Sequence, residues 1–177
     1  MRYLAFAAIL SFCYSCATAP SGPVRSLHKV RANHVFSAPD REDQFVAVLR
    51  GSDTLTATVH LQILLNDRTV IYRDSFAAEA LLDHGFKPDP GATVTDADRR
   101  AYIIQRLNGL FDSDRFTRPA YSVVENAAAS ITRQEVADYL EDQPQATAFY
   151  YLVGKGDRRY IAFYPPEDQA VVFFNCC

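Results

Sequence analysis

The sequence lacks any long cluster of basic residues, because its lysines and arginines stand singly or in pairs such as Arg99-Arg100 and Arg158-Arg159. The chain has 18 basic and 21 acidic residues, for a formal net charge of −3 at pH 7. Proteins that bind nucleic acids neutralise phosphates with clustered Lys and Arg. We therefore expect no nucleic-acid partner.

Several catalytic and metal-binding motifs are also missing. No Gly-x-Ser-x-Gly turn is present to hold a serine nucleophile. Zinc sites bring their ligands at short, regular spacings, whereas His28, His34, His60 and His84 are scattered singly. The sequence therefore predicts no metal site and no cofactor, and it favours a binding protein over an enzyme.

The longest N-terminal apolar run, from Leu4 to Phe12, is too short to span a membrane as a helix, which needs roughly 20 residues. It follows a short charged start at Met1 and Arg2 and precedes small residues. This order is typical of an export signal that is cleaved. The sequence predicts that the protein leaves the cytoplasm.

Cys16 stands just after this apolar run. Here the chain resembles the precursors of bacterial lipoproteins, in which such a Cys is acylated and becomes the new first residue. That family usually has Leu three residues before the Cys and a small residue two before it, where this chain has Cys13 and Tyr14. The resemblance implies a lipid anchor at Cys16 and, with Ala17 next, sorting to the outer membrane. The alternative is a secreted or soluble periplasmic protein cut after Ala17 or Ala19.

The rest of the chain is expected to form one domain on a tether. Residues 1–16 are the cleaved signal, and residues 17–40 are assigned to a flexible tether because they begin with small, polar and Pro-bearing sequence. Residues 41–177 are enough for a single α+β domain with a substantial core.

Alternation of apolar and polar residues predicts two groups of strands. Residues 54–63 alternate strictly, which places Leu55, Ala57, Val59, Leu61 and Ile63 on one side of a half-buried strand. Flanking strands are expected at 45–50 and 69–74. A second group is expected at 147–153, 159–164 and 170–175, where apolar residues occur on both faces, so we expect both faces to be covered.

Between these groups the period changes to that of helices. A short helix is expected over 76–84, with Gly85 after its end. A longer helix over 95–112 begins with a capping arrangement of Thr95 and Asp98, and a third starts at Thr132. The predicted fold is α+β: two strand meanders form one antiparallel or mixed sheet, and about three helices pack on one of its faces.

Aromatic residues in the C-terminal strands are the strongest candidate for a binding surface. Tyr150, Tyr160 and Tyr164 lie there with Arg159. Arg158 with Arg159 beside Tyr160 suits a polar-aromatic contact. The alternative is that these aromatic side chains form part of the core.

The chain ends in Cys176-Cys177. Adjacent Cα atoms lie about 3.8 Å apart, closer than the roughly 4.4 to 6.8 Å of an ordinary disulfide. The pair could form a strained vicinal ring, an intermolecular bridge that gives a homodimer, two thiols or a weak metal site. It could also simply close the last strand as two small apolar residues.

The favoured interpretation is a non-enzymatic cell-envelope lipoprotein whose domain binds an envelope protein or serves as an adaptor. A structural subunit of an envelope assembly is one alternative. Another is a periplasmic hydrolase, for which the carboxylates near the predicted helix ends and His84 would be the acid-base groups. These carboxylates also suit helix capping and solvation, and they are Asp74, Glu79, Asp83, Asp96, Asp98, Asp112 and Asp114.

Overall fold

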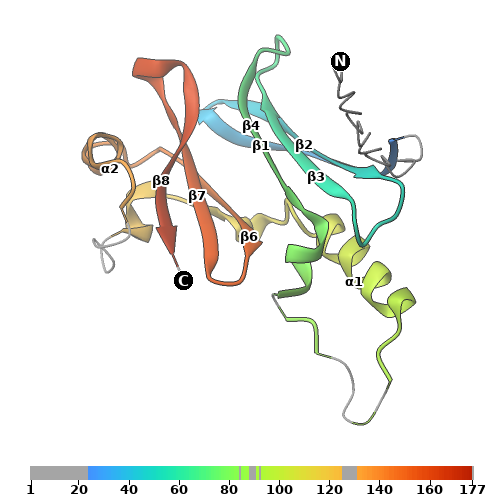
Figure 1. Cartoon of the computed structure of the whole chain (residues 1–177). Helices are drawn as coiled ribbons and strands as arrows, with labels where there is room; N and C mark the ends of the chain where they lie inside the picture. Colours follow the sequence, from blue (N-terminus) through green and yellow to red (C-terminus); the bar gives the residue numbers. More distant parts are fainter. Residues whose placement is uncertain (1–23, 84, 88–90, 92, 125–130, 177) are drawn as a thin grey trace, which may run out of the picture.

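The computed structural model describes residues 24–83, 85–87, 91, 93–124 and 131–176, which form two antiparallel sheets (Figure 1). Sheet A contains, in spatial order, β1 (Arg25–Ala38), β2 (Arg41–Gly51), β3 (Thr58–Leu64) and β4 (Val70–Ala77). Sheet B contains β5 (Phe116–Thr117), β6 (Ala148–Gly154), β7 (Asp157–Tyr164) and β8 (Gln169–Cys176).

Two α-helices and several 3-10 turns connect or follow these strands. The α-helices are α1 (Asp96–Asn108) and α2 (Gln134–Glu141). The 3-10 segments are η1 (Ala78–Asp83), η2 (Ser113–Arg115), η3 (Ala120–Val123) and η5 (Pro165–Glu167).

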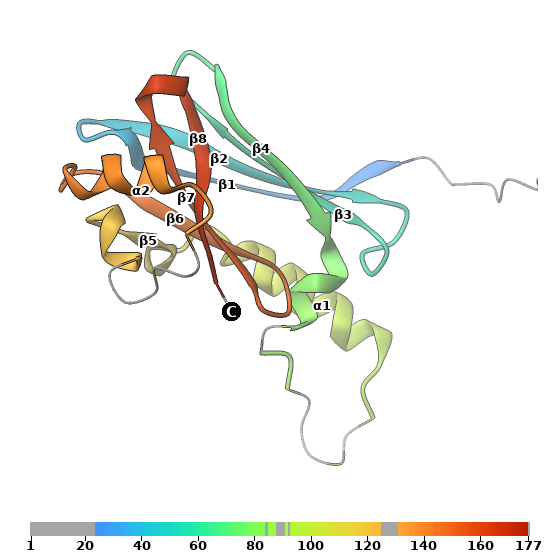
Figure 2. The ribbon, with the colours of Figure 1, turned by 60° about the vertical axis from the view of Figure 1, so that its left-hand side comes forward.

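The predicted single α+β sheet with helices on one face is wrong. The two meanders form separate sheets, and their facing sides share one apolar core with α1. In Figure 2, α1 and the strands of sheet B lie on the same side of sheet A. Alternation within each meander determines which side chains are buried. It does not determine whether two meanders join edge to edge or stack face to face, and this is why the prediction failed.

The shared core consists of large apolar side chains from both sheets and α1. Sheet A contributes Phe45, Val59, Leu61, Ile63 and Ile71; sheet B contributes Phe149, Tyr151 and Ile161; α1 contributes Ile103 and Leu107. The strict alternation expected around β3 is confirmed, since Val59, Leu61 and Ile63 are fully buried.

Residues 25–38, which we assigned to the flexible tether, form β1 and pair along β2. The alternation is present there, with Val30 and Ala32 packed against the core and Phe36 buried. It is weak because His28 and His34 occupy two inward positions and make hydrogen bonds to Asn108 and to the Phe111 carbonyl. The ordered chain therefore begins well before residue 41.

Sheet B makes apolar contacts on both faces, as the apolar character of its strands predicts. One face belongs to the shared core, and the other packs against η3 and α2. A second cluster on this far face includes Val136 and Leu140 of α2 with Ala148, Ala162 and Phe173 of the sheet.

The helices are shorter than the sequence pattern indicates. The capping box of Thr95 and Asp98 is confirmed, but α1 ends at Asn108. The segment over 76–84 continues β4 through Ala77 and then forms η1, and Gly85 has the expected positive φ of 88°. Arg133, not Thr132, precedes α2, because the Thr132 hydroxyl donates a hydrogen bond to the Val172 carbonyl. No helix among the described residues is long and apolar enough to cross a membrane.

Candidate functional site

The far face of sheet B carries an aromatic ladder beside the part that packs against η3 and α2, and the Phe174 end of this ladder is buried. Tyr150 on β6 lies opposite Tyr160 on β7, and Tyr160 lies near Phe174 on β8. Adjacent ring centroids are 5.3 Å apart in both pairs. Such cross-strand aromatic pairs stabilise a sheet surface, so we expect the ladder to stabilise this part of sheet B.

Two arginines lie against this ladder. The guanidinium carbon of Arg115, from η2, is 5.0 Å from the centroid of the Tyr150 ring. That of Arg158, from β7, is 5.1 Å from the same centroid. Cation-π contacts at such distances are attractive. We call Arg115, Tyr150, Arg158 and Tyr160 the Arg–Tyr cluster.

The cluster has unused hydrogen-bonding capacity. Arg158 donates through Nη1 to the Tyr160 hydroxyl over 3.3 Å, and this hydrogen bond raises the pKa of Arg158. Within the described part of the chain, Arg158 makes no ion pair with a carboxylate, and Arg115 makes only a 3.8 Å contact to the exposed Asp114. A guanidinium has five N–H donors, so both arginines can donate further hydrogen bonds to carboxylate or carbonyl oxygens.

The structure divides the predicted surface residues among three places. Tyr150 and Tyr160 lie together in the Arg–Tyr cluster. Tyr164 lies farther along β7, with its ring 5.5 Å from Tyr139 of α2 and the Arg133 guanidinium 5.7 Å away. Arg159 lies on the opposite face of sheet B, where it pairs with Tyr151, and is therefore apart from the three tyrosines.

Arg159 belongs to a hydrogen-bonded chain between the sheets. It donates to Asp74 of β4 over 2.8 Å, and Tyr151 of β6 donates to the same carboxylate oxygen over 2.5 Å. Because Tyr151 gives its single hydroxyl hydrogen to Asp74, Tyr72 is the donor in the 2.5 Å contact between the two tyrosines. Burial raises the pKa of Tyr72 to about 12 and also raises that of Tyr151.

Sequence reasoning missed Arg115, and it assigned Arg159 rather than its neighbour Arg158 to the candidate surface. Strand periodicity places residues 158 and 160 on one face and residue 159 on the other, so alternation along β7 could have selected Arg158. Arg115 lies about 35 positions before Tyr150, and its approach depends on the pairing of Phe116 with Phe149. No local sequence signal gives that pairing.

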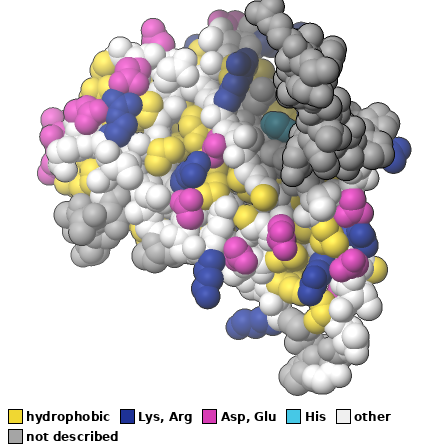
Figure 3. Space-filling view, in the orientation of Figure 1, with side chains coloured by type: hydrophobic (Ala, Val, Ile, Leu, Met, Phe, Trp, Pro, Cys, Tyr) yellow, Lys and Arg dark blue, Asp and Glu magenta, His cyan; other side chains and the backbone are white. Residues whose placement is uncertain are grey.

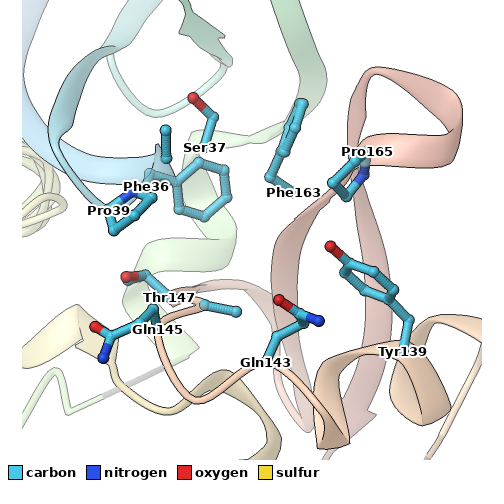
Figure 4. Close-up of a pocket in the computed structure, with 11 residues that line it drawn as sticks. Phe36, Ser37, Pro39, Tyr139, Gln143, Gln145, Thr147, Phe163 and Pro165 are labelled. Atoms are coloured by element: carbon cyan, nitrogen blue, oxygen red, sulfur yellow. The ribbon is translucent and has the colours of Figure 1, made fainter.

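A cavity of about 330 Å³ lies between the end of β1, α2 and the connection from α2 to β6 (Figure 4). Tyr139, Gln143 and Gln145 lie across it from Phe36 and Phe163. Its described lining residues include aromatic, proline, amide and hydroxyl groups but no carboxylate, His, Lys or Arg. Such a lining suits the binding of a neutral ligand more than acid-base catalysis.

Three of the candidate catalytic carboxylates, Asp74, Asp83 and Asp98, lie in separate contacts. Asp98 belongs to the α1 capping box, and Asp74 contacts Arg159 and Tyr151. Asp83 accepts a hydrogen bond from the Lys155 amide over 3.1 Å. His84, Cys16 and Cys177 lie outside the described residues, whereas Cys176 ends β8 and packs against the second apolar cluster.

The described residues contain no group of three or more His, Cys, Asp or Glu side chains arranged to hold a metal ion. Comparisons with models of known families, with curated proteins and with solved structures found no match.

Proposed function

We propose that the protein is a non-enzymatic cell-envelope lipoprotein whose domain binds an envelope protein through the Arg–Tyr cluster. The leader and the position of Cys16 support the lipid anchor and an outer-membrane location. The observation that carries the binding role is the placement of two arginines around the partly exposed Tyr150 on the far face of sheet B.

The chemistry of this cluster is that of a protein interface. Arg and Tyr are enriched at the residues that contribute most to binding energy. A partner that brings carboxylates to the two guanidinium groups would form charge-assisted hydrogen bonds. We therefore propose a partner surface with acidic side chains beside an apolar or aromatic one.

The hydrolase alternative receives less support. It would need acid-base groups together in a cleft, whereas Asp74, Asp83 and Asp98 lie in separate hydrogen-bonded contacts. A structural subunit of an envelope assembly would use the same partly exposed cluster. The identity of the captured partner distinguishes such a subunit from an adaptor.

The test is site-specific photo-crosslinking in cells, followed by binding measurements with the purified partner. The photoreactive residue replaces Asp114, which is exposed and adjacent to Arg115, and a control probe replaces the exposed Glu79 on η1. We expect one envelope protein to be crosslinked from position 114 and not from position 79. Arg158→Gln and Tyr150→Ala should each weaken its binding at least about tenfold.

Arg99→Gln is the matched control, because it removes one exposed positive charge from α1, away from the cluster. Equal crosslinking from both probe positions would contradict the proposal. Unchanged affinity in the Arg158 and Tyr150 variants would contradict it as well. A crosslink to a second copy of the chain would assign the cluster to a homodimer instead.

A further inference from the structure

The outer face of sheet A, which points away from the shared core, carries a concentration of positive charge. Antiparallel register places Arg31, Val46, Gln62 and Arg73 in one row across the four strands. Lys29, Val48, His60 and Ser75 form the next row. Strands lie about 4.8 Å apart, so the two ends of a row are separated by roughly 14 Å.

Arg50 extends the same face beside these rows, opposite Ser26 and Thr58. Four exposed cations, Lys29, Arg31, Arg50 and Arg73, therefore lie on one sheet surface. We call them the basic face. Among the strand residues, Glu42 places an acidic side chain on this surface, opposite Val35 at the start of β2. The charge is notable because the whole chain is net negative.

The cations of the basic face are not neutralised by the rest of the described structure. None of the four forms an ion pair with a described residue, whereas Arg99, Arg100, Arg133 and Arg159 do. Around α1, by comparison, basic and acidic side chains are interspersed (Figure 3). An extended surface of one sign creates a field that attracts a partner of the opposite sign.

The position of the chain's N-terminal part indicates which partner that is. If Cys16 is the anchored residue, eight residues (16–23) precede Val24, and they reach at most about 29 Å even when fully extended. The strand that follows, β1, contributes Lys29 and Arg31 directly to the basic face. A short tether thus ends at the sheet whose outer surface is cationic.

We infer that the basic face docks on the anionic phospholipid surface to which the lipid anchor holds the domain. This inference rests on the proposed lipoprotein anchor. Anionic headgroups attract basic residues that lie within a Debye length, which is about 8 to 10 Å at ordinary ionic strength. Docking in this way directs sheet B and its Arg–Tyr cluster away from the membrane, toward a protein partner.

The test is vesicle co-sedimentation with the chain lacking residues 1–16, whose fold is checked by circular dichroism. Without acylation, binding reports the basic face alone, so failure here is distinct from failure of the anchor or of the Arg–Tyr cluster. We expect binding to vesicles of phosphatidylcholine with phosphatidylglycerol, little binding to phosphatidylcholine alone, and weaker binding as salt is added.

The decisive variant combines Arg31→Gln with Arg73→Gln. Each basic residue near an anionic surface contributes about fivefold to binding, so this double variant should bind roughly 25-fold more weakly. The matched control combines Arg99→Gln with Lys155→Gln, two exposed cations outside the basic face, and should bind like the unmodified chain.

Equal binding to both kinds of vesicle, or equal loss in both double variants, would overturn the inference. The double variant Arg31→Gln, Arg73→Gln could instead leave vesicle binding unchanged and lose binding to a soluble acidic polypeptide. That result would assign the basic face to a protein partner.

Discussion

Tyr151 and Asp74 join the two sheets directly, through a hydrogen bond of 2.5 Å from the phenol hydroxyl of β6 to the carboxylate of β4. The Tyr151 side chain is fully buried in the shared core. Arg159 donates to the same carboxylate oxygen, so the carboxylate has a positive partner. The apolar core brings the sheets together, and this contact specifies how they face each other.

Replacing Tyr151 with Phe removes the hydroxyl and leaves Asp74 and the Tyr72 hydroxyl each without one partner. Losing a buried hydrogen bond in this way costs about 1 to 3 kcal/mol. We expect urea denaturation to show this loss of unfolding free energy. Tyr164→Phe is the matched control, because the Tyr164 hydroxyl makes no hydrogen bond to a described residue. Equal stability of the two variants would show that the contact between the sheets contributes nothing.

We expect α1 to contribute to the free energy of unfolding through both its packing and its N-terminal cap, with packing contributing more. Leu107 is buried in the shared core, and a buried Leu→Ala substitution costs about 2 to 5 kcal/mol. Thr95→Ala removes the cap and should cost about 1 kcal/mol. Thr93→Ala, at an exposed neighbouring position, should be nearly neutral. Thermal denaturation that failed to rank the three variants in this order would contradict the assigned role of α1.

Much of the fold could be predicted where the signal is local. The alternation around β3 and the cap formed by Thr95 and Asp98 both follow from residues within a few positions of one another. β1 was missed because its inward positions include His28 and His34 rather than large apolar side chains. The stacking of the sheets was missed because contacts such as Tyr151 with Asp74 join residues far apart in the sequence.

The residues of the candidate site, too, could be predicted only where the sequence signal is local. Tyr150 and Tyr160 were identified from their residue type and their strands. Arg115 and the basic face could not be, because their placement depends on strand pairing between distant segments. Arg31 and Arg73, for example, are isolated cations in the sequence and meet in one row only through the register of sheet A.

The cap of α1 also predicts a dependence of stability on pH. The hydrogen bond from the Thr95 side chain holds the pKa of Asp98 below its usual value of 3.8. A lowered folded-state pKa contributes stability above the unfolded pKa and loses it as the pH falls through the folded pKa. Stability should therefore fall as the pH decreases below about 4. The fall should be smaller in Thr95→Ala than in Thr93→Ala, as measured by urea denaturation across pH, and identical acid profiles would contradict this.

The terminal cysteines predict an intermolecular disulfide. A bond between neighbouring residues is strained, and an exported protein meets oxidising conditions. Non-reducing electrophoresis of the mature protein should show some dimer, which disappears in the double variant Cys176→Ser, Cys177→Ser. A monomer lighter by two hydrogens would instead establish a vicinal ring, and a fully reduced monomer would exclude both forms.

The most direct test of the lipoprotein proposal is mass spectrometry of the mature N-terminus from the membrane fraction. The account predicts that Cys16 is the first residue and is acylated, and that Cys16→Ala leaves the protein unprocessed or mislocalised. A soluble mature protein beginning at Thr18 or Pro20 would contradict the lipid anchor.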